Sequence, residues 1–241
     1  DAAAMKAPPD VVFLPGGLGT RALIDDDRFV ARLGELARAA KLTLTVCTGS
    51  FLLAATGVLD GLRATTNKRA FPSVAGRFPA VHWSESARWV SDGAVMSSSG
   101  VSAGTDMCAH FLELAFGPRL ARQVVEECEY TVRFGAEEDP FAERARARAA
   151  LSEPPSVKST RVGQPPLRVL LVVYDQFELL DTFGPLEMFE LSNRALRESG
   201  AEHEAFQLTT VSVDGHAVKS FGGPYFEPDV VLCSGGRDGS A

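Results

Sequence analysis

The sequence predicts an α/β protein, in which helices cover a mostly parallel β-sheet. Two short apolar runs end abruptly at turn residues, as strands buried on both faces do: residues 10–14 stop at Pro15, and residues 42–46 stop at Cys47. Between them, from about residue 26 to residue 40, apolar residues recur at helical spacing. Strand, helix and strand in this order form a parallel crossover unit, the basic element of an α/β sheet.

The segments that follow extend this pattern. A helix of small and apolar residues is predicted at 51–56, directly after the second strand. A second apolar helix is predicted at about 105–116, where a Gly-Pro pair ends it. Asp92-Gly93 lies between two short apolar runs, which is a hairpin signal. We therefore expect a small antiparallel element beside the parallel sheet.

The C-terminal part begins after a change in composition. Residues 137–166 are rich in Glu, Arg, Ala, Pro and Ser, which predicts a linker or a surface strap. The elements predicted beyond it are a strand at 168–174, a helix at 182–196, a strand at 206–213 and a possible strand at 228–232. Pro185 is expected in the first turn of that helix.

Composition and charge point to a small-molecule partner. The 241 residues are 45% hydrophobic and 23% charged, which fits a globular protein and excludes a disordered chain. A formal charge of -7 repels a phosphate backbone, so we expect no nucleic-acid partner. No apolar run approaches the ~20 residues that span a bilayer, which predicts no membrane partner and a cytoplasmic location. Cysteines and histidines show no metal-ligand spacing, so no metal site is expected.

Cys47 is the strongest candidate for a catalytic nucleophile. It stands where an apolar strand ends and a helix of small residues begins, a geometry that projects the side chain into a cleft. The helix N-terminus there favours a thiolate. A buried core cysteine is the alternative, and position alone does not decide between the two. Gly17 and Thr48 could supply backbone N–H groups to an oxyanion hole, although a tight turn also explains the Gly-Gly pair.

An acidic residue and a histidine are weaker candidates. Asp181 precedes the helix predicted at 182–196, and its spacing alone favours a helix N-cap. Glu187, one turn further on, is expected to be an ordinary helix acid or an interface residue. His82, beside Trp83, is the histidine expected near the cleft, and a structural role is the simpler interpretation even there.

Five groups of residues, taken together, carry a family resemblance. They are Leu14-Pro15-Gly16-Gly17, Val46-Cys47-Thr48-Gly49, Leu59-Asp60-Gly61 with Ala64-Thr65-Thr66, Ser99-Gly100-Val101-Ser102-Ala103-Gly104-Thr105-Asp106, and Leu180-Asp181 with Gly184-Pro185-Leu186-Glu187-Met188-Phe189. These motifs resemble the DJ-1/PfpI superfamily, which is class I glutamine amidotransferase-like, and the last group resembles its isonitrile-hydratase-like branch. The resemblance implies a flavodoxin-like or Rossmann-like fold with a nucleophile elbow.

The motifs occur in a different order from that of the family. In the family, the counterpart of residues 167–241 comes first and the counterpart of residues 1–136 follows. This chain therefore resembles a circularly permuted member, a single domain over residues 1–241 in which residues 137–166 join the original ends. A fragment of a tandem array and a domain-swapped dimer are the alternatives, and the sequence does not separate them.

The resemblance also implies roles for individual residues. Cys47 is the nucleophile, Asp181 is the acid that reaches its sulfur, and Gly17 and Thr48 supply backbone donors. The resemblance therefore replaces the interpretation of Asp181 as an N-cap with the expectation that it is a catalytic acid. Thr48 stands where other branches carry His, which disfavours a protease-like activity, and Asp181 stands where glyoxalase relatives carry Glu. No metal or organic cofactor is implied, and a homodimer is expected by analogy.

Hydration of an isonitrile to an N-substituted formamide is the resulting hypothesis, with Cys47 as nucleophile and Asp181 as acid and base. The first alternative is a glyoxalase or amide-hydrolase activity at the same site. The second is a redox-sensing or ligand-binding protein, in which Cys47 is oxidised and no turnover occurs. The sensory half of a transcription regulator is disfavoured, because no helix-turn-helix segment is recognised in the sequence.

Overall fold

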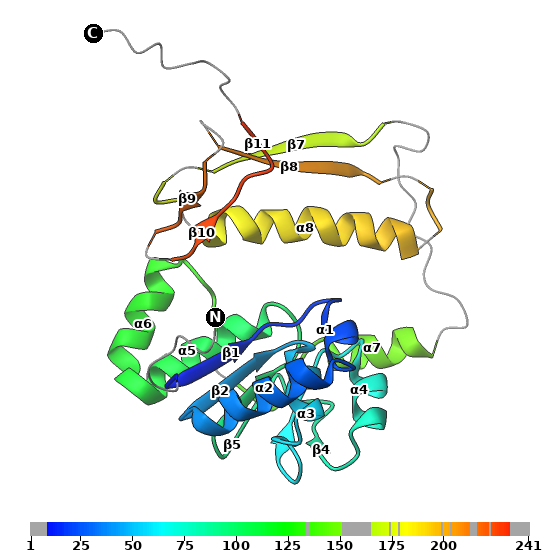
Figure 1. Ribbon diagram of the computed structural model, residues 1–241, viewed down its shortest axis with the longest axis vertical. Coiled ribbons are helices and arrows are strands. Elements are labelled where there is room, and N and C mark those ends of the chain that lie inside the picture. Colours follow the sequence, from blue (N-terminus) through cyan, green and yellow to red (C-terminus); the bar gives the residue numbers. More distant parts are fainter. Residues whose placement is uncertain are drawn as a thin grey trace, which may run out of the picture. The chain divides into compact units, whose positions relative to one another are not determined.

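The computed structural model has two compact units, Asp1–Leu151 (unit 1) and Ser152–Ala241 (unit 2) (Figure 1). The described residues are 9–133, 135–150, 165–173, 175–177, 179–198, 200–202, 204–212, 216–221 and 223–231. For seven of these residues only the backbone is described and not the side chain: Ala149, Leu170, Val172, Asp181, Pro185, Met188 and Val231. The boundary between the units falls within residues 137–166, the segment predicted as a linker.

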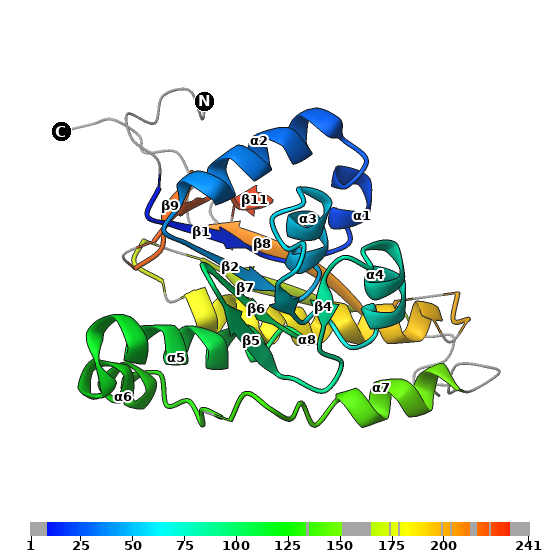
Figure 2. The same cartoon turned by 90° about the horizontal axis from the view of Figure 1, so that it is seen from below.

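Unit 1 is built on a mostly parallel sheet of four strands (Figure 2). In order across the sheet, they are β1 (Val11–Leu14), β2 (Leu42–Val46), β6 (Val95–Ser98) and β5 (Trp89–Asp92). β1, β2 and β6 run parallel, whereas β5 is antiparallel to β6. Gly93 lies in the β5–β6 hairpin with a φ of 57°, a left-handed conformation that glycine adopts readily. The predicted parallel strands and the hairpin beside them are confirmed.

Helices cover both faces of this sheet. They are α1 (Thr20–Leu23), α2 (Asp27–Ala39), α3 (Gly49–Ala55), α4 (Phe71–Arg77), α5 (Ala103–Phe116), α6 (Pro118–Glu127) and α7 (Ala142–Ala149). Leu33 of α2 and Leu53 of α3 share one apolar core with Val95, and Met107 of α5 shares a second core with Met96. Because Val95 and Met96 are neighbours in β6, they point to opposite faces. The sheet of unit 1 is therefore sandwiched between helices, and the predicted α/β class is confirmed.

α7 lies within the segment that composition predicts to be a linker. The helix alternates Ala with Arg and Glu, all of which are strong helix formers. The same residues that make the segment polar, as in a linker, therefore also favour a helix. The chain just before α7 is held to unit 1, because the Asp139 N–H donates to the Ser86 carbonyl at 2.7 Å and the Asp139 carboxylate accepts from the Ser99 hydroxyl. The composition therefore did not predict the helix Ala142–Ala149, although a segment held to unit 1 in this way is compatible with the surface strap that was the alternative to a linker.

Unit 2 contains a second parallel sheet and one long helix. Its elements are β7 (Leu167–Val172), α8 (Leu179–Glu198), β8 (Phe206–Ser212), β9 (Val218–Lys219), β10 (Tyr225–Phe226) and β11 (Val230–Val231). β7 and β11 pair with β8 in parallel, and β9 pairs with β10 in antiparallel fashion. The side chain of Asn193 links α8 to β8, because its amide donates to the Phe206 carbonyl at 2.8 Å and accepts from the Phe206 N–H at 2.9 Å.

α8 begins earlier than the sequence predicts. Leu179 and Phe183 pack against a core that contains Phe177, and this burial favours helix over residues that precede Pro185. Pro185 is consequently the seventh residue of the helix, although its missing N–H costs a helical hydrogen bond. Asp181 is the third residue, inside the first turn, so the interpretation of Asp181 as the N-cap is wrong.

Neither a helix that could span a membrane nor a cluster of side chains that could hold a metal ion occurs among the described residues. No helix there is long and apolar enough to cross a membrane. Within the same residues, no group of three or more His, Cys, Asp and Glu side chains is arranged to hold a metal ion.

Unit 1 carries two short strands beyond the main sheet. β3 (Arg63–Ala64) and β4 (His82–Trp83) pair in parallel. His82 is exposed in β4, and its backbone N–H donates to the Leu62 carbonyl at 2.9 Å. This position decides neither the expected place of His82 near the cleft nor its structural role, and both stay predictions.

Candidate functional site

Cys47 forms a sharp turn between β2 and α3. Its φ of 58° lies in the left-handed region, which is strained for a residue with a side chain. Three hydrogen bonds hold the turn: the Cys47 N–H donates to the Ser98 carbonyl at 3.2 Å, and the Cys47 carbonyl accepts from the hydroxyls of Ser50 at 3.0 Å and Thr66 at 3.1 Å. The surroundings thus maintain a conformation that presents a half-buried thiol at the end of a parallel strand.

Two glycines permit β1 to end directly against this turn. A Cβ atom added to Gly49 would lie 2.1 Å from the Leu14 carbonyl oxygen, and one added to Gly16 would lie 2.8 Å from Cys47 Cβ. Real Cβ atoms do not approach so closely, so only glycine fits either position without a backbone shift. The Pro-Gly-Gly turn after the first predicted strand and the turn at Cys47 are therefore packed against each other.

Gly17 and Thr48 lie together, but their hydrogen bonds differ from the expected oxyanion hole. The Gly17 N–H donates to Thr48 Oγ1 at 3.0 Å, and the Thr48 hydroxyl lies 3.2 Å from the Gly17 carbonyl. The Gly17 N–H is thus engaged by the Thr48 side chain. An anion could use this donor only by displacing the hydroxyl. Sequence reasoning assigned Thr48 a backbone role and missed the part played by its side chain.

Asn67 contacts Cys47 and was not among the residues expected in the site. Its Nδ2 donates to Cys47 Sγ at 3.2 Å. Its Oδ1 accepts from the backbone N–H groups of Arg69 at 2.9 Å and Ala70 at 3.3 Å, which fixes the orientation of the amide. The amide N–H thus contacts the sulfur from a fixed position. The available sequence signal was the position of Asn67, directly after the Ala64-Thr65-Thr66 motif.

Lys68 anchors the segment that carries Asn67. Its side chain is 6% exposed, and Nζ donates to Thr65 Oγ1 at 2.8 Å and to the Ala87 carbonyl. Burial lowers the pKa of Lys68 to about 8, because it disfavours the ammonium form, while Asp139 and Glu85 oppose this shift. A buried cation with fixed partners thus ties the Asn67 segment to the chain before β5.

The other residues singled out in the sequence lie away from these contacts or outside the description. Asp181 belongs to α8 of unit 2, and its side chain is among those outside the described residues, as is the whole of Cys233. Cys108 is half-buried, and burial raises the pKa of its thiol, whereas Cys128 is exposed. Glu187 is exposed on α8. Within the described chain, Cys47 is the cysteine that combines a strained turn with a donor to its sulfur.

Comparison with known proteins gives a family for the N-terminal half. Residues 2–114 match the DJ-1/PfpI family. A curated relative, isonitrile hydratase of Pseudomonas putida, is 32% identical over 121 residues, which are 50% of this chain and 52% of the relative. The chain thus spans about half the length of the curated relative that it matches.

Several solved structures are also similar. A DJ-1 superfamily protein from Salmonella typhimurium has a TM-score of 0.46 at 22% identity, over 54% of this chain and 69% of that one. DJ-1beta of Drosophila melanogaster has a TM-score of 0.43 at 24% identity, over 51% of this chain and 64% of that one. A ThiJ/PfpI family protein from Pseudomonas syringae has a TM-score of 0.40 at 23% identity, over 82% of this chain and 66% of that one.

Proposed function

Because residues 2–114 of this chain match the DJ-1/PfpI family, we propose that the protein is a cysteine-dependent enzyme that hydrates an isonitrile to an N-substituted formamide. The observation that carries this proposal is the left-handed turn at Cys47, whose sulfur accepts a hydrogen bond from Asn67 at 3.2 Å. The name of the Pseudomonas putida relative, isonitrile hydratase, supports the choice of substrate class.

The reaction begins with attack by Cys47 Sγ on the terminal carbon of the isonitrile. A carbon–sulfur bond forms, and the same carbon gains a proton, which the proposal assigns to the carboxyl group of Asp181. The product of this step is a thioimidate. The Asn67 amide contributes by stabilising the sulfur as a thiolate before attack.

Water completes the reaction. It adds to the thioimidate carbon, the carbon–sulfur bond breaks, and the formamide leaves while one proton returns to the carboxylate of Asp181. Isonitrile and water together have the composition of the formamide, so no electrons are gained or lost and the balance requires no redox cofactor. The Thr48 N–H is the proposed donor to the polar atoms of the intermediate, with the Gly17 N–H available once the Thr48 hydroxyl moves.

The proposal is tested by incubating the purified protein with an alkyl isocyanide and quantifying the formamide by mass spectrometry. Cys47→Ala and Asp181→Asn should each abolish product while thermal unfolding stays cooperative. Matched controls are Cys128→Ala, an exposed cysteine, and Glu187→Gln, an exposed acid on the same helix as Asp181. Both controls should retain full activity.

The variants separate the parts of the mechanism. Product formed by Cys47→Ala would refute the nucleophile, and product formed by Asp181→Asn alone would refute the acid while leaving the nucleophile in place. If the wild-type protein yields no formamide, hydratase activity is rejected. Lactate formed from an α-ketoaldehyde in a Cys47-dependent manner would then establish a glyoxalase, and selective oxidation of Cys47 to the sulfinate by peroxide would establish a redox sensor.

A further inference from the structure

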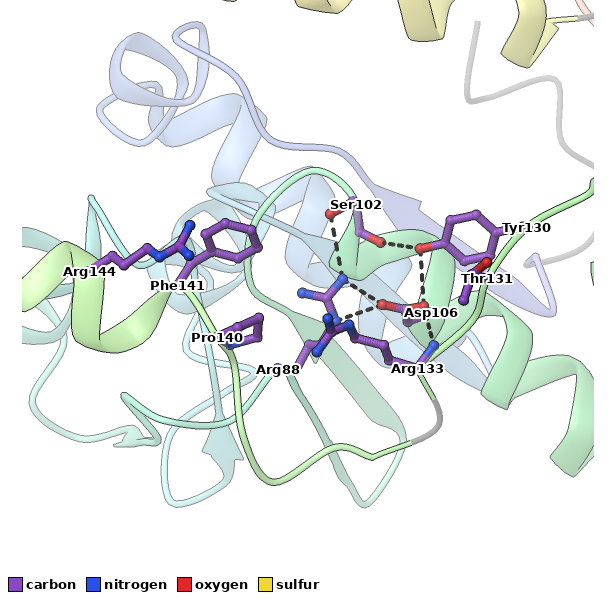
Figure 3. Close-up of a pocket in the computed structure, with 9 residues that line it drawn as sticks. All are labelled: Arg88, Ser102, Asp106, Tyr130, Thr131, Arg133, Pro140, Phe141 and Arg144. Atoms are coloured by element: carbon purple, nitrogen blue, oxygen red, sulfur yellow. Dashed lines mark hydrogen bonds and ion pairs between the residues drawn. The ribbon is translucent and has the colours of Figure 1, made fainter.

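Unit 1 contains a pocket of about 320 Å³ that does not include Cys47 among its lining residues (Figure 3). Its volume lies at the lower end of the range for small-molecule sites. The lining comes from the residue before β5, from the start of α5, from the chain after α6, and from α7 with the chain that leads into it. Ser102 and Asp106 of the Ser99–Asp106 motif line this pocket, but the proposed reaction at Cys47 does not use it.

Buried and fully paired charges form the floor of the pocket. The side chains of Arg88 and Asp106 are 5% and 0% exposed, and Arg88 Nε donates to Asp106 Oδ2 at 2.6 Å. Asp106 Oδ1 accepts from the Tyr130 hydroxyl at 3.1 Å and from the Arg133 N–H at 2.9 Å. Both carboxylate oxygens are therefore occupied, so the floor is a rigid ion pair whose negative charge is already satisfied.

The rim supplies positive charge without a matching acid. The guanidinium groups of Arg133 and Arg144 have no acidic partner within 4 Å among the described residues. Arg144 lies over the Phe141 ring at 5.7 Å from its centroid. Figure 3 shows Phe141 and Arg144 to one side of Arg88 and Tyr130 to the other. The lining thus contains three arginines and a single acidic side chain, in a chain whose formal charge is -7.

We propose that this pocket binds a small organic anion, a carboxylate carried on an apolar or aromatic body. Arg133 and Arg144 bind the carboxylate, since the planar guanidinium matches its geometry. Phe141, whose ring is 49% exposed, contacts the apolar body of the ligand. The paired floor excludes a cation from the pocket, because the one carboxylate there already has four N–H and O–H donors.

Benzoate is the first probe, because it joins a carboxylate to an aromatic ring of suitable size. Binding is measured by saturation-transfer NMR and isothermal titration with the full chain at low ionic strength. We expect saturable binding that weakens at least tenfold in Arg144→Ala and in Arg133→Ala. Both side chains are exposed, so these variants should fold. Arg119→Ala on α6, outside the pocket lining, removes the same charge and should bind as the wild type does.

Two further ligands and one variant make the test decisive. Benzamide, which is neutral and of the same shape, should bind at least tenfold more weakly, and equal binding would overturn the recognition of charge. Inorganic phosphate binding more tightly than benzoate would overturn the carboxylate class. If Arg119→Ala loses as much benzoate affinity as Arg133→Ala and Arg144→Ala, the attraction is unspecific and the proposal is overturned. Cys47→Ala should leave benzoate binding unchanged, which separates this site from the proposed catalytic one.

Discussion

Replacement of Asn67 by Asp tests whether an amide N–H stabilises the nucleophile. In the structure, Asn67 Nδ2 lies 3.2 Å from Cys47 Sγ, while Oδ1 accepts from the N–H groups of Arg69 and Ala70. Aspartate is nearly isosteric and retains an oxygen acceptor for this turn. It replaces the N–H donor with an oxygen that carries negative charge. The substitution therefore changes the contact with sulfur and preserves the local backbone.

The expected change in the reaction rate of Cys47 follows from the lost N–H donor of Asn67 and from its distance to Cys47 Sγ. A hydrogen bond to a charged acceptor contributes about 1.5–3 kcal/mol, so its loss should slow the reaction of the Cys47 sulfur roughly 10- to 100-fold. Coulomb repulsion between two unit charges at the 3.2 Å separation is about 5 kcal/mol at an effective dielectric constant of about 20. This second figure is an upper bound, because Cys47 is only half-buried and water screens the charges. We expect the Cys47 sulfur of Asn67→Asp to react at least about 10-fold more slowly than that of the wild type.

The assay is alkylation of Cys47 by iodoacetamide at neutral pH, followed by mass spectrometry of the Cys47 peptide. Alkylation of the exposed Cys128 in the same sample is the internal control and should keep its rate. Thermal unfolding of wild type and variant should coincide within a few degrees. If Asn67→Asp folds normally and Cys47 is alkylated as fast as in the wild type, the inferred role of Asn67 is refuted.

Two further predictions concern buried charges. Asp106→Leu removes the closest acidic partner of the buried Arg88, leaving Asp139 at 3.9 Å, and should lower the free energy of unfolding by about 3–5 kcal/mol in urea denaturation. The double variant with Arg88→Leu should recover part of this loss, and an additive result would contradict the pairing. Lys68 has a pKa of about 8 when folded and 10.5 as its ordinary value, so the unfolded chain binds its proton more tightly and stability should rise between pH 8 and 10.5. Lys68→Met should flatten this rise, and an unchanged pH profile would disprove the cause.

The strands and helices around the nucleophile could be predicted because their signals are local. The apolar runs that end at Pro15 and Cys47 became β1 and β2, and the Asp92-Gly93 signal became a hairpin. The helix α7 was not predicted, because the local composition there is ambiguous. Residues 142–149 have the charge of a linker and also the helix propensity of Ala and Arg, and they form α7.

The start of α8 shows how tertiary packing changes a boundary. Pro185 and Asp181 together suggested a helix that begins at residue 182, with Asp181 as its cap. Burial of Leu179 and Phe183 against the core of unit 2 extends the helix to Leu179. The catalytic role of Asp181, the circular permutation and the homodimer stay predictions.

The sequence by itself determined the class of the fold and the position of the turn at Cys47, because the hydrophobic pattern and the turn residues around Cys47 act between neighbours in the chain. Only the tertiary structure decided which groups touch the sulfur and which charges face one another. Asn67 lies 20 residues from Cys47, and Arg133 and Asp106 are separated by 27 residues. No local spacing records such contacts, since they arise when separate segments pack on one sheet and bury their polar groups against fixed partners.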